Sequence, residues 1–424
     1  MANGFLNAQT YSNALMLLVK NQLVWGKLVN GQFKNEVTDE NGLTTSVKAP
    51  PHFIAQDGAT LQAQRMLIGS RTVQVDQYKN VHCTIGDLEY VQSFNDLMKN
   101  SAMSSAASAL AHAIDAKIAA AALQFPSAVY TNYGAGIKTT ADVNKAHTQL
   151  MAQGVPNEQL KGVLAFVDSE KIANQLVAYN NVGGASLSAL EEARVQTPMR
   201  NIAFYATQQT PFWSNGDHTM SAGPLIKGAN QNVNYKDVKT VMTQSLILDG
   251  LGNSKTMNAG EQFTISGVKE YDWRQQKTLA NDQVFTVITG GTTDVADGSI
   301  TVTVAPAIIV PATSDGTDTI ANSAFATVNA VPADNAAVTF LGSASTTYDA
   351  RVAFHKSAIS LVSAKLQRPF TGEVAFTTDK ETGITIRYWR GSDITTGVHA
   401  HRWDCIFGVV NTDRRLGVRI FGTT

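Results

Sequence analysis

The stretch FNDLMKNSAMSSAASALAHAIDAKIAAAALQF, residues 94–125, decides how this chain can fold. Either Ser93 or Asn95 can cap its start, and Pro126 ends it. At 1.5 Å per residue, the stretch predicts a helix of roughly 45 Å. Its apolar face, at helical spacing, consists of Met103, Ala107, Leu110, Ile114 and Ile118. Alanine fills most other positions, so we expect a central core helix that runs through an extended fold as a spine.

The composition of the chain is unusual in its charge. Asp, Glu, Lys and Arg make up only 16% of the 424 residues, against roughly 25% in an average domain, and the net charge is −1. This balance excludes nucleic-acid binding by bulk positive charge, and it excludes disorder caused by charge repulsion. A large and nearly neutral chain repels its own copies weakly, so it either associates or is simply rich in neutral polar residues.

The sequence carries no signal for export or membrane insertion. Cys83 and Cys405 are far apart and form no disulfide framework or metal motif, which favours a reducing cytoplasm. The apolar run at residues 14–19 lacks a basic n-region and a cleavage site, so we expect no signal peptide. No stretch approaches the roughly 18 apolar residues that a membrane span needs, and we expect no membrane partner.

The segments around the spine helix mix helical and extended patterns. Helices are predicted over residues 7–29, 140–153 and 169–179, and a helix or turn over 355–361. Strands are predicted over residues 71–75, 81–85, 163–167, 202–206, 384–388, 405–410 and 416–421. Residues 30–80 are polar and broken by glycine and proline, and such a long irregular segment is usually functional or an extended loop. The pattern predicts a mixed α/β body.

Between residues 230 and 345 the helical periodicity disappears. Short alternating runs at 262–266, 284–288 and 300–304 predict strands, with weaker ones at 238–248 and 337–341. Turn pairs such as Asp249–Gly250 and Asp297–Gly298 separate them. We therefore predict an antiparallel β-barrel or sandwich, inserted into the mixed α/β chain.

Catalytic motifs are weak in this sequence. Residues 134–136 read Gly-Ala-Gly without the third glycine of a phosphate loop, which favours a flexible linker. His399 and His401, with Asp404 and Cys405 nearby, have donor types that zinc accepts. Nothing else there has a recognised ligand spacing, so two His on the polar face of a strand is the favoured interpretation. We expect no enzyme activity, no metal and no cofactor.

Arginine and aromatic residues alternate in the C-terminal strands. This pattern is typical of nucleic-acid stacking or of a protein interface, and the near-zero net charge favours the interface. The candidate subunit-contact residues, in the extended segment, the β-rich loops and the C-terminal strands, are Arg65, Arg71, Lys277, Asp282, Asp294, Trp389, Arg414 and Arg415. An alternative is a carbohydrate-binding or other surface-interaction protein built on the β-rich insert, with Trp273, Trp389 and Trp403 exposed.

The order of the parts, with several local motifs, resembles a known family. The motifs are GEQFTISGV at 260–268 with QVFTV at 283–287, FHKSAISL at 354–361, and RWDCIFGV at 402–409 with 414–420. They resemble the major capsid (coat) proteins of tailed bacteriophages, of the Hong Kong 97-type fold. More narrowly, they are similar to the coat proteins of short-tailed Salmonella-type phages that carry an insertion domain.

The resemblance implies an α+β fold with defined domains. They are an N-terminal arm (1–43), an extended two-stranded loop (44–80), a peripheral domain with the spine helix (81–138), an axial domain in two parts (139–231 and 346–424) and an inserted antiparallel β-barrel (232–345). The few charged residues and the many Asn, Gln, Ser and Thr agree with the resemblance to a protein that forms many subunit contacts, because each unpaired charge buried at a contact is costly.

The resemblance also implies a structural protein with particular partners. Copies of the chain are expected to form pentamers and hexamers of an icosahedral shell, guided by a scaffolding protein and joined by a portal protein. Packaged double-stranded DNA lies inside and is contacted non-specifically. The expected location is the virion capsid, after assembly in the host cytoplasm. The Lys–Asn cross-link of Hong Kong 97 has no identifiable residues here, so we expect none.

Overall fold

The computed structural model forms two compact units, each described here by itself. Unit 1 comprises residues Met1–Val47, Thr72–Ala121 and Ile359–Asn411, and unit 2 comprises Lys48–Arg71, Ala122–Ala358 and Thr412–Thr424. The residues that the structure describes are 8–31, 43–48, 53–55, 66, 70–86, 101–126, 136–137, 139–178, 199–220, 223–228, 242–311, 323–393 and 397–421. In this part of the chain, no helix has both the length and the apolar character needed to cross a membrane.

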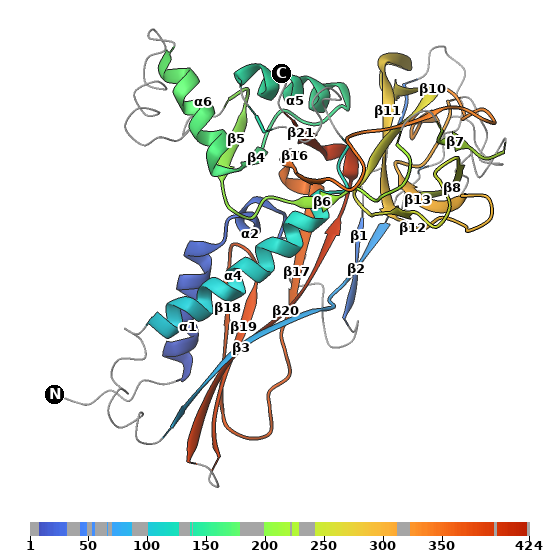
Figure 1. The fold of residues 1–424 in the computed structure, drawn as a ribbon. Helices are drawn as coiled ribbons and strands as arrows, with labels where there is room; N and C mark the ends of the chain where they lie inside the picture. Colours follow the sequence, from blue (N-terminus) through green and yellow to red (C-terminus); the bar gives the residue numbers. More distant parts are fainter. Residues whose placement is uncertain are drawn as a thin grey trace. The chain divides into compact units, whose positions relative to one another are not determined.

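Unit 1 is built on a long antiparallel sheet (Figure 1). Its central strand β20 (Val398–Asn411) pairs with β19 (Thr385–Asp393), with β17 (Ile359–Ala364) and with β3 (Gln77–Gly86), and β18 (Glu373–Thr378) pairs with β19. The strands predicted at 81–85, 384–388 and 405–410 all lie in this sheet, and each is longer than predicted. Pairing with neighbouring strands extends each strand beyond the apolar run from which the sequence predicts it.

Two shorter strands join unit 1 through a small valine-rich cluster. β1 (Thr44–Lys48) pairs with β2 (Ser70–Gln74), where the alternating run at 71–75 predicts a strand. Val47, Val73 and Val75 are buried against side chains of β17 and β20. Burial on one face, with exposed residues between, is the pattern of a strand covering one side of a sheet.

The helices of unit 1 pack on the sheet. The predicted helix 7–29 is instead two helices, α1 (Ala8–Gln22) and α2 (Trp25–Leu28), with residue 7 outside the described part of the chain. The break has a physical cause: the buried carboxylate of Asp115 accepts hydrogen bonds from the backbone N–H groups of Val24 (2.8 Å) and Gly26 (3.0 Å). A side chain from another helix thus caps α2, which the local sequence does not reveal.

The spine helix is α4 (Ser101–Ala122). The five apolar residues predicted for its core face are each at most 1% exposed. The helix ends at Ala122, three residues before the predicted end, because Phe125 donates its backbone N–H to the Ala122 carbonyl in a turn. The predicted start at residue 94 lies outside the described residues. The prediction of a core helix is therefore confirmed over the described part of the stretch.

The α/β part of unit 2 is a four-stranded sheet with two helices. The strand order is β21 (Gly417–Ile420), β16 (Arg351–His355), β4 (Leu160–Leu164), β5 (Ile202–Ala206), with β4 and β5 parallel. Helix α5 (Thr140–Ala152) lies where the sequence predicts a helix over 140–153, and it starts with a capping box of Thr139 and Asp142. The strand predicted at 202–206 is confirmed without change.

Two predicted elements of this part need correction. The strand expected at 163–167 is β4, which ends at Leu164, and Phe166 and Val167 instead begin helix α6 (Phe166–Ala178) at 57% and 58% exposure. The helix expected from residue 169 therefore starts three residues earlier. Asp168 does not cap it but forms an ion pair with Arg351 on β16. Tertiary contacts override a short apolar run here.

The segment predicted as a helix or turn at 355–361 is a turn followed by a strand. A single 3-10 turn, η3, covers Lys356–Ala358, and β17 begins at Ile359. All six residues of β17 are buried. Such a run, buried on both faces, lacks the alternation that identifies a half-buried strand in a sequence.

The β-rich part of unit 2 is a six-stranded antiparallel sheet (Figure 1). Its strand order is β14 (Val338–Phe340), β10 (Gln262–Asp272), β11 (Lys277–Thr289), β13 (Ile300–Ala305), β8 (Gln244–Asp249) and β7 (Leu225–Ile226). The strands predicted at 262–266, 284–288, 300–304 and 337–341 correspond to β10, β11, β13 and β14. β8 covers the last part of the strand predicted at 238–248, whose residues 238–241 lie outside the described part of the chain. β7 joins these strands from before residue 230. The edges also meet, since Ile226 donates to the Ala336 carbonyl and Val338 to the Pro224 carbonyl. Its core includes Phe263, Phe285 and Phe340.

Candidate functional site

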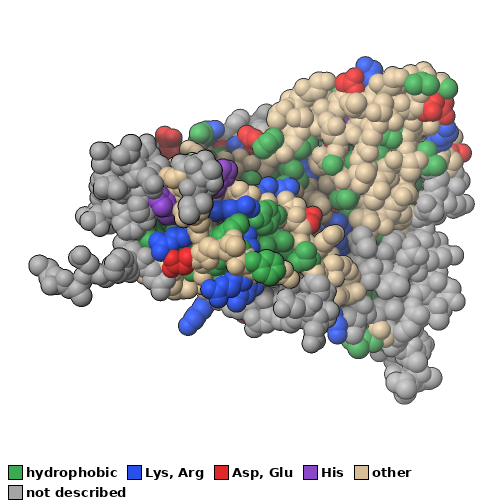
Figure 2. Space-filling model, turned by 90° about the horizontal axis from the view of Figure 1, so that it is seen from below, with side chains coloured by type: hydrophobic (Ala, Val, Ile, Leu, Met, Phe, Trp, Pro, Cys, Tyr) green, Lys and Arg blue, Asp and Glu red, His purple; other side chains and the backbone are tan. Residues whose placement is uncertain are grey.

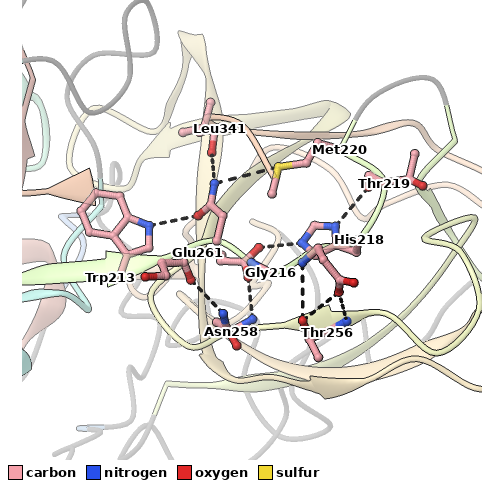
Figure 3. Close-up of polar contacts among 12 residues, drawn as sticks. Trp213, Gly216, His218, Thr219, Met220, Thr256, Asn258, Glu261 and Leu341 are labelled. Carbon is pink, nitrogen blue, oxygen red and sulfur yellow. Dashed lines mark hydrogen bonds and ion pairs between the residues drawn. The ribbon is translucent and has the colours of Figure 1, made fainter. Parts of the chain in front are cut away.

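A buried carboxylate, Glu261, organises the start of strand β10 (Figure 3). Only 1% of Glu261 is exposed, and its Oε1 accepts hydrogen bonds from the backbone N–H groups of Gly216 (2.8 Å) and Asn258 (2.5 Å). Its Oε2 lies 2.7 Å from Nε2 of His218, whose side chain is fully buried. A carboxylate with this many donors is stabilised without water.

His218 has an acceptor at each ring nitrogen. Its Nδ1 lies 3.1 Å from the Thr219 carbonyl, and because a carbonyl only accepts, Nδ1 carries the proton of that bond. The His218 ring also lies beside the Phe340 ring, tilted at 57° with a centroid distance of 4.5 Å.

The residues around His218 fix the loop that leads from β6 (Phe212–Ser214) into the β-rich sheet. Asn215 donates to the Leu341 and Ser343 carbonyls and accepts from Trp213 Nε1. Asp217 accepts from the backbone and the hydroxyl of Thr256, and these bonds, with the Lys255 ammonium, lower the pKa of Asp217. Figure 3 shows that residues from the loop after β6, from the segment around Thr256 and Glu261, and from the segment at Leu341 meet here.

Only glycine fits at position 216. A Cβ atom there would lie 1.9 Å from the carbonyl oxygen of Thr256, in strand β9 (Thr256–Met257), and a backbone atom cannot move aside as the end of a side chain can. The close approach lets the Gly216 N–H reach Glu261. The loop and the carboxylate therefore depend on each other.

Strand β10 is also tied to the α/β part of unit 2. The guanidinium of Arg419, on β21, is fully buried, donates to the Gly260 carbonyl (2.9 Å) and lies 4.7 Å from the ring centroid of Trp213. The side-chain amide of Gln262 donates to the Phe125 carbonyl (2.9 Å). These buried polar bonds attach the β-rich sheet to the rest of the unit, and buried polar groups favour one arrangement because any other leaves them unpaired.

The far end of β10 carries a second buried carboxylate, Glu270. Both of its oxygens accept from one donor group, the Nε2 amide of Gln149 on α5, at 2.9 and 3.1 Å. Burial raises the pKa of Glu270 to about 7, and the Gln149 amide only partly opposes this. Glu270 lines a cavity of about 70 Å³ between the β-rich sheet and the end of α5.

An arginine–aspartate cluster lies on the sheet of unit 1. Asp404 is fully buried and forms ion pairs with Arg387 and Arg402 on either side, and Nη2 of both arginines points to the hydroxyl of Tyr78. Figure 2 shows Lys, Arg and His side chains gathered among hydrophobic ones on the face that it presents. Arg402 is 34% exposed, so part of the positive charge of this cluster lies at the surface.

The zinc hypothesis for the C-terminal strands finds no support. No group of three or more possible metal ligands occurs among the described residues. The Nδ1 atom of His401 is instead 2.7 Å from the hydroxyl of Tyr388, and burial lowers the pKa of His401 to about 4. Asp404 is committed to arginines, and burial raises the pKa of the Cys405 thiol to about 12. Cys405 is a buried residue of the core.

The predicted contact residues of the β-rich insert are all at the surface. Lys277 and Asp282 lie on β11, and Asp294 lies in a turn. The carboxylate of Asp294 accepts from the Ala296 backbone N–H, so it stabilises its own turn. The next residue, Val295, is 74% exposed. The insert therefore presents charged and apolar groups outward, as a contact surface requires.

The other predicted contact residues that the structure describes are less exposed to solvent. Arg71 is buried, and Arg414 and Arg415 are partly exposed on the 3-10 turn η4 (Arg414–Leu416) and line the cavity beside Glu270. Trp389 is half-buried and donates to the Thr371 carbonyl. Arg65 lies outside the described residues. The arginines of η4 thus face a cavity of their own unit.

The carbohydrate-binding alternative is not favoured. It requires exposed tryptophans, but Trp403 is only 1% exposed and stacks on Tyr388 at 5.6 Å. Trp273 and Trp389 are each partly buried.

Sequence reasoning missed Glu261, Glu270, His218 and Asp115. All are buried, and only Asp115 lies within a predicted element, the spine helix. One available signal was Glu261, a charged residue directly before the alternating strand predicted at 262–266. A charged residue that is buried in such a strand needs partners.

Fold and site together define a mixed α+β protein whose most buried charges hold the chain together. The model of the P22 coat protein family (gene protein 5) matches residues 1–422 of the chain. The chain therefore belongs to the P22 coat protein family and is a phage major capsid protein. Among curated proteins, no sequence matches it significantly.

Solved structures similar to this chain include phage capsids. The Mycobacterium phage Che8 structure is 11% identical with a TM-score of 0.44, covering 94% of this chain and 91% of that one. The capsid of Ralstonia phage GP4 is 8% identical with a TM-score of 0.45, covering 95% and 89%. The coat protein I-domain of CUS-3 is 29% identical over 30% of this chain and 96% of that one, with a TM-score of 0.19.

Proposed function

We propose that this chain assembles into pentamers and hexamers of an icosahedral shell that encloses packaged double-stranded DNA. The observation that carries the proposal is the match to a coat protein family over residues 1–422, nearly the whole chain. A scaffolding protein guides assembly, a portal protein joins the shell, and DNA contacts are non-specific. Assembly takes place in the host cytoplasm, and the product is the virion capsid.

The proposed subunit has a Hong Kong 97-type fold with an inserted β-barrel. The order of the described elements supports it: helix α1, the paired strands β1 and β2, the long helix α4, an α/β sheet, the six-stranded sheet, and a return to the α/β sheet. The hydrogen bonds between the edge strands β7 and β14 support a closed barrel, because closure satisfies the backbone groups of both edges.

The insert has two proposed roles, to stabilise the monomer and to contact its neighbours across local two-fold axes. The first is supported by the buried bonds of Arg419 to Gly260 and of Gln262 to Phe125. The second is supported by the exposure of Lys277, Asp282 and Asp294. Deletion of residues 232–345 is expected to lower monomer stability or particle-size control, and an unchanged shell contradicts both roles.

Assembly itself is tested by electron microscopy. The full chain is co-expressed with its scaffolding partner, and closed particles of uniform size are expected. A chain that stays a stable compact monomer under all such conditions contradicts the proposal. Boiling the particles in denaturant is expected to give a single band at monomer mass, whereas a covalent ladder contradicts the absence of a cross-link.

A further inference from the structure

The two edges of the α/β sheet in unit 2 differ. At one edge, Arg419 on β21 donates its backbone N–H to the Pro126 carbonyl (2.8 Å), so a neighbouring segment occupies that edge. The other edge is β5, the last strand of the sheet (Figure 1). In the part of the chain that the structure describes, no strand pairs with the outer side of β5. Among these residues, the sheet is therefore closed at β21 and open at β5.

The backbone groups of β5 alternate between its two sides. Thr207, directly after the strand, donates its N–H to the Leu164 carbonyl of β4 (3.0 Å). Because successive residues of a strand direct their backbone groups to opposite sides, those of Phe204 and Ala206 point away from β4. Ile202 points outward as well, but its groups are bonded within the preceding turn. Phe204 and Ala206 thus offer their N–H and C=O groups to a partner strand.

The sequence of β5, IAFYA, lacks the features that protect an edge strand. It contains no charged residue and no proline, and its register with β4 runs through all five residues without a bulge. Natural proteins usually place a lysine, a proline or a bulge at an open edge, because an unprotected edge pairs with another chain. An edge without such protection is expected where the pairing is part of the function.

Large apolar side chains are exposed at the same end of the sheet. Phe166 and Val167, at the start of α6, are 57% and 58% exposed, and Tyr205 on β5 is 40% exposed. Because β4 and β5 are parallel, the start of α6 and the last residues of β5 lie at one end of the sheet. Apolar side chains that gather at the surface beside an open edge are typical of a contact between proteins.

We propose that β5 extends the α/β sheet into a second copy of this chain, by pairing its open edge with a strand of that copy. Phe166, Val167 and Tyr205 then pack around the joint. This contact depends on the proposed self-assembly of the coat protein, and it is one surface through which two copies meet. A second copy is the expected occupant because self-assembly brings copies of one chain together, and an uncharged edge does not select a charged partner.

Hydrogen exchange of the full chain tests the pairing directly. Particles made with the scaffolding partner are compared with the unassembled chain, and exchange of the peptide that covers residues 202–206 is measured by mass spectrometry. Pairing is expected to slow this exchange about tenfold or more in the particles. The peptide that covers β21 is the internal reference, because the Arg419 N–H is already bonded within one chain. Equal exchange of residues 202–206 in both states overturns the proposal.

Two variants break the edge in different ways. Ala206→Pro removes an outward N–H and leaves the bonds to β4 in place, and Tyr205→Glu puts a charge at the joint, where Lys161 lies 5.8 Å from the Tyr205 ring centroid. Each variant is expected to lower the fraction of chain that sediments as particles about tenfold or more, with the urea midpoint of the unassembled chain unchanged. Thr148→Glu, at an exposed position of α5, is the matched control for the added charge and is expected to assemble like the wild type.

The outcomes separate this contact from assembly itself. If the wild type forms no particles, self-assembly fails and the contact fails with it. If the wild type and both edge variants form the same particles, self-assembly stands and the contact at β5 is wrong. If residues 202–206 lose their protection when the scaffolding partner is removed from intact particles, that partner and not a second copy covers the edge, which also overturns the proposal.

Discussion

The two ends of strand β10 bury a carboxylate in opposite ways. At the first end, Glu261 receives two backbone N–H groups and an imidazole. At the far end, Glu270 receives only the side-chain amide of Gln149, and burial raises its pKa to about 7. Both carboxylates are at least 95% buried. Burial alone therefore does not decide whether a carboxylate stabilises the fold, because the number and charge of its donors do.

The difference separates two tasks within one strand. The donors around Glu261 come from the loop at 215–220 and from residue 258, so the carboxylate fixes how the chain enters the β-rich sheet. Glu270 contacts a helix of the α/β part and borders a cavity, and its raised pKa makes its ionisation respond to pH. Glu261 thus has a structural role, whereas the ionisation of Glu270 changes with pH.

The largest effect is expected from Glu261→Ala. The change leaves the N–H groups of Gly216 and Asn258 and the His218 ring without their acceptor. Removing one partner of a buried pair costs about 3–5 kcal/mol, so the free energy of unfolding in urea is expected to fall by that amount. Glu158→Ala, at an exposed position, is the control and is expected to stay within about 0.5 kcal/mol. A loss equal to that of the control contradicts the structural role.

A smaller effect of opposite sign is expected from Glu270→Gln. Because the folded pKa lies near 7 and the ordinary value is 4.5, the folded chain keeps a proton that the unfolded chain has released between these values. Wild-type stability is therefore expected to fall as pH rises from about 4.5 to 7, and to be level above it. The variant lacks this loss, so at about pH 8 it is expected to be more stable by about 3 kcal/mol.

Urea unfolding of both chains from about pH 4 to 8 measures this difference. The wild-type curve is expected to slope downward relative to the variant curve, and Glu158→Gln is expected to follow the wild type. Parallel curves for wild type and Glu270→Gln would mean that Glu270 is not buried as an ionisable group.

The smallest effect is expected from Gln149→Ala. It removes the amide that opposes the raised pKa of Glu270, so that pKa is expected to rise further. Hydrogen bonds to a charged group contribute about 1.5–3 kcal/mol, so at about pH 8 unfolding free energy is expected to fall by roughly the lower figure. At about pH 4 the loss is expected to be smaller, since Glu270 is then neutral. Gln275→Ala, which is exposed, is the control, and an equal loss at both pH values contradicts this account.

Elements with a long or strictly periodic pattern were predictable from sequence. The apolar face of α4 and the strand at 202–206 appear where the pattern places them, because side chains three or four apart in a helix share one face. Errors occur where a distant residue ends an element. Asp115 breaks the first helix at Val24, and the ion pair of Asp168 with Arg351 accompanies an early start of α6.

The site was much less predictable than the fold. The alternating arginines and aromatics near Arg387 and Arg402 pointed to a contact surface, and their cluster with Asp404 and Tyr78 has the charge for one. The cavity of Arg414 and Glu270 joins positions 144 residues apart, and no local spacing connects such residues.

The sequence by itself determined the spine helix, the β-rich segment and, through its motifs, the family. These depend on periodicity and on the order of segments, which are local properties of a chain. Only the tertiary structure decided that Glu261 meets His218, that Glu270 meets Gln149, and that β7 and β14 join. The reason is physical: the state of a buried charge depends on donors that folding brings from other segments, and one stretch of sequence does not contain them.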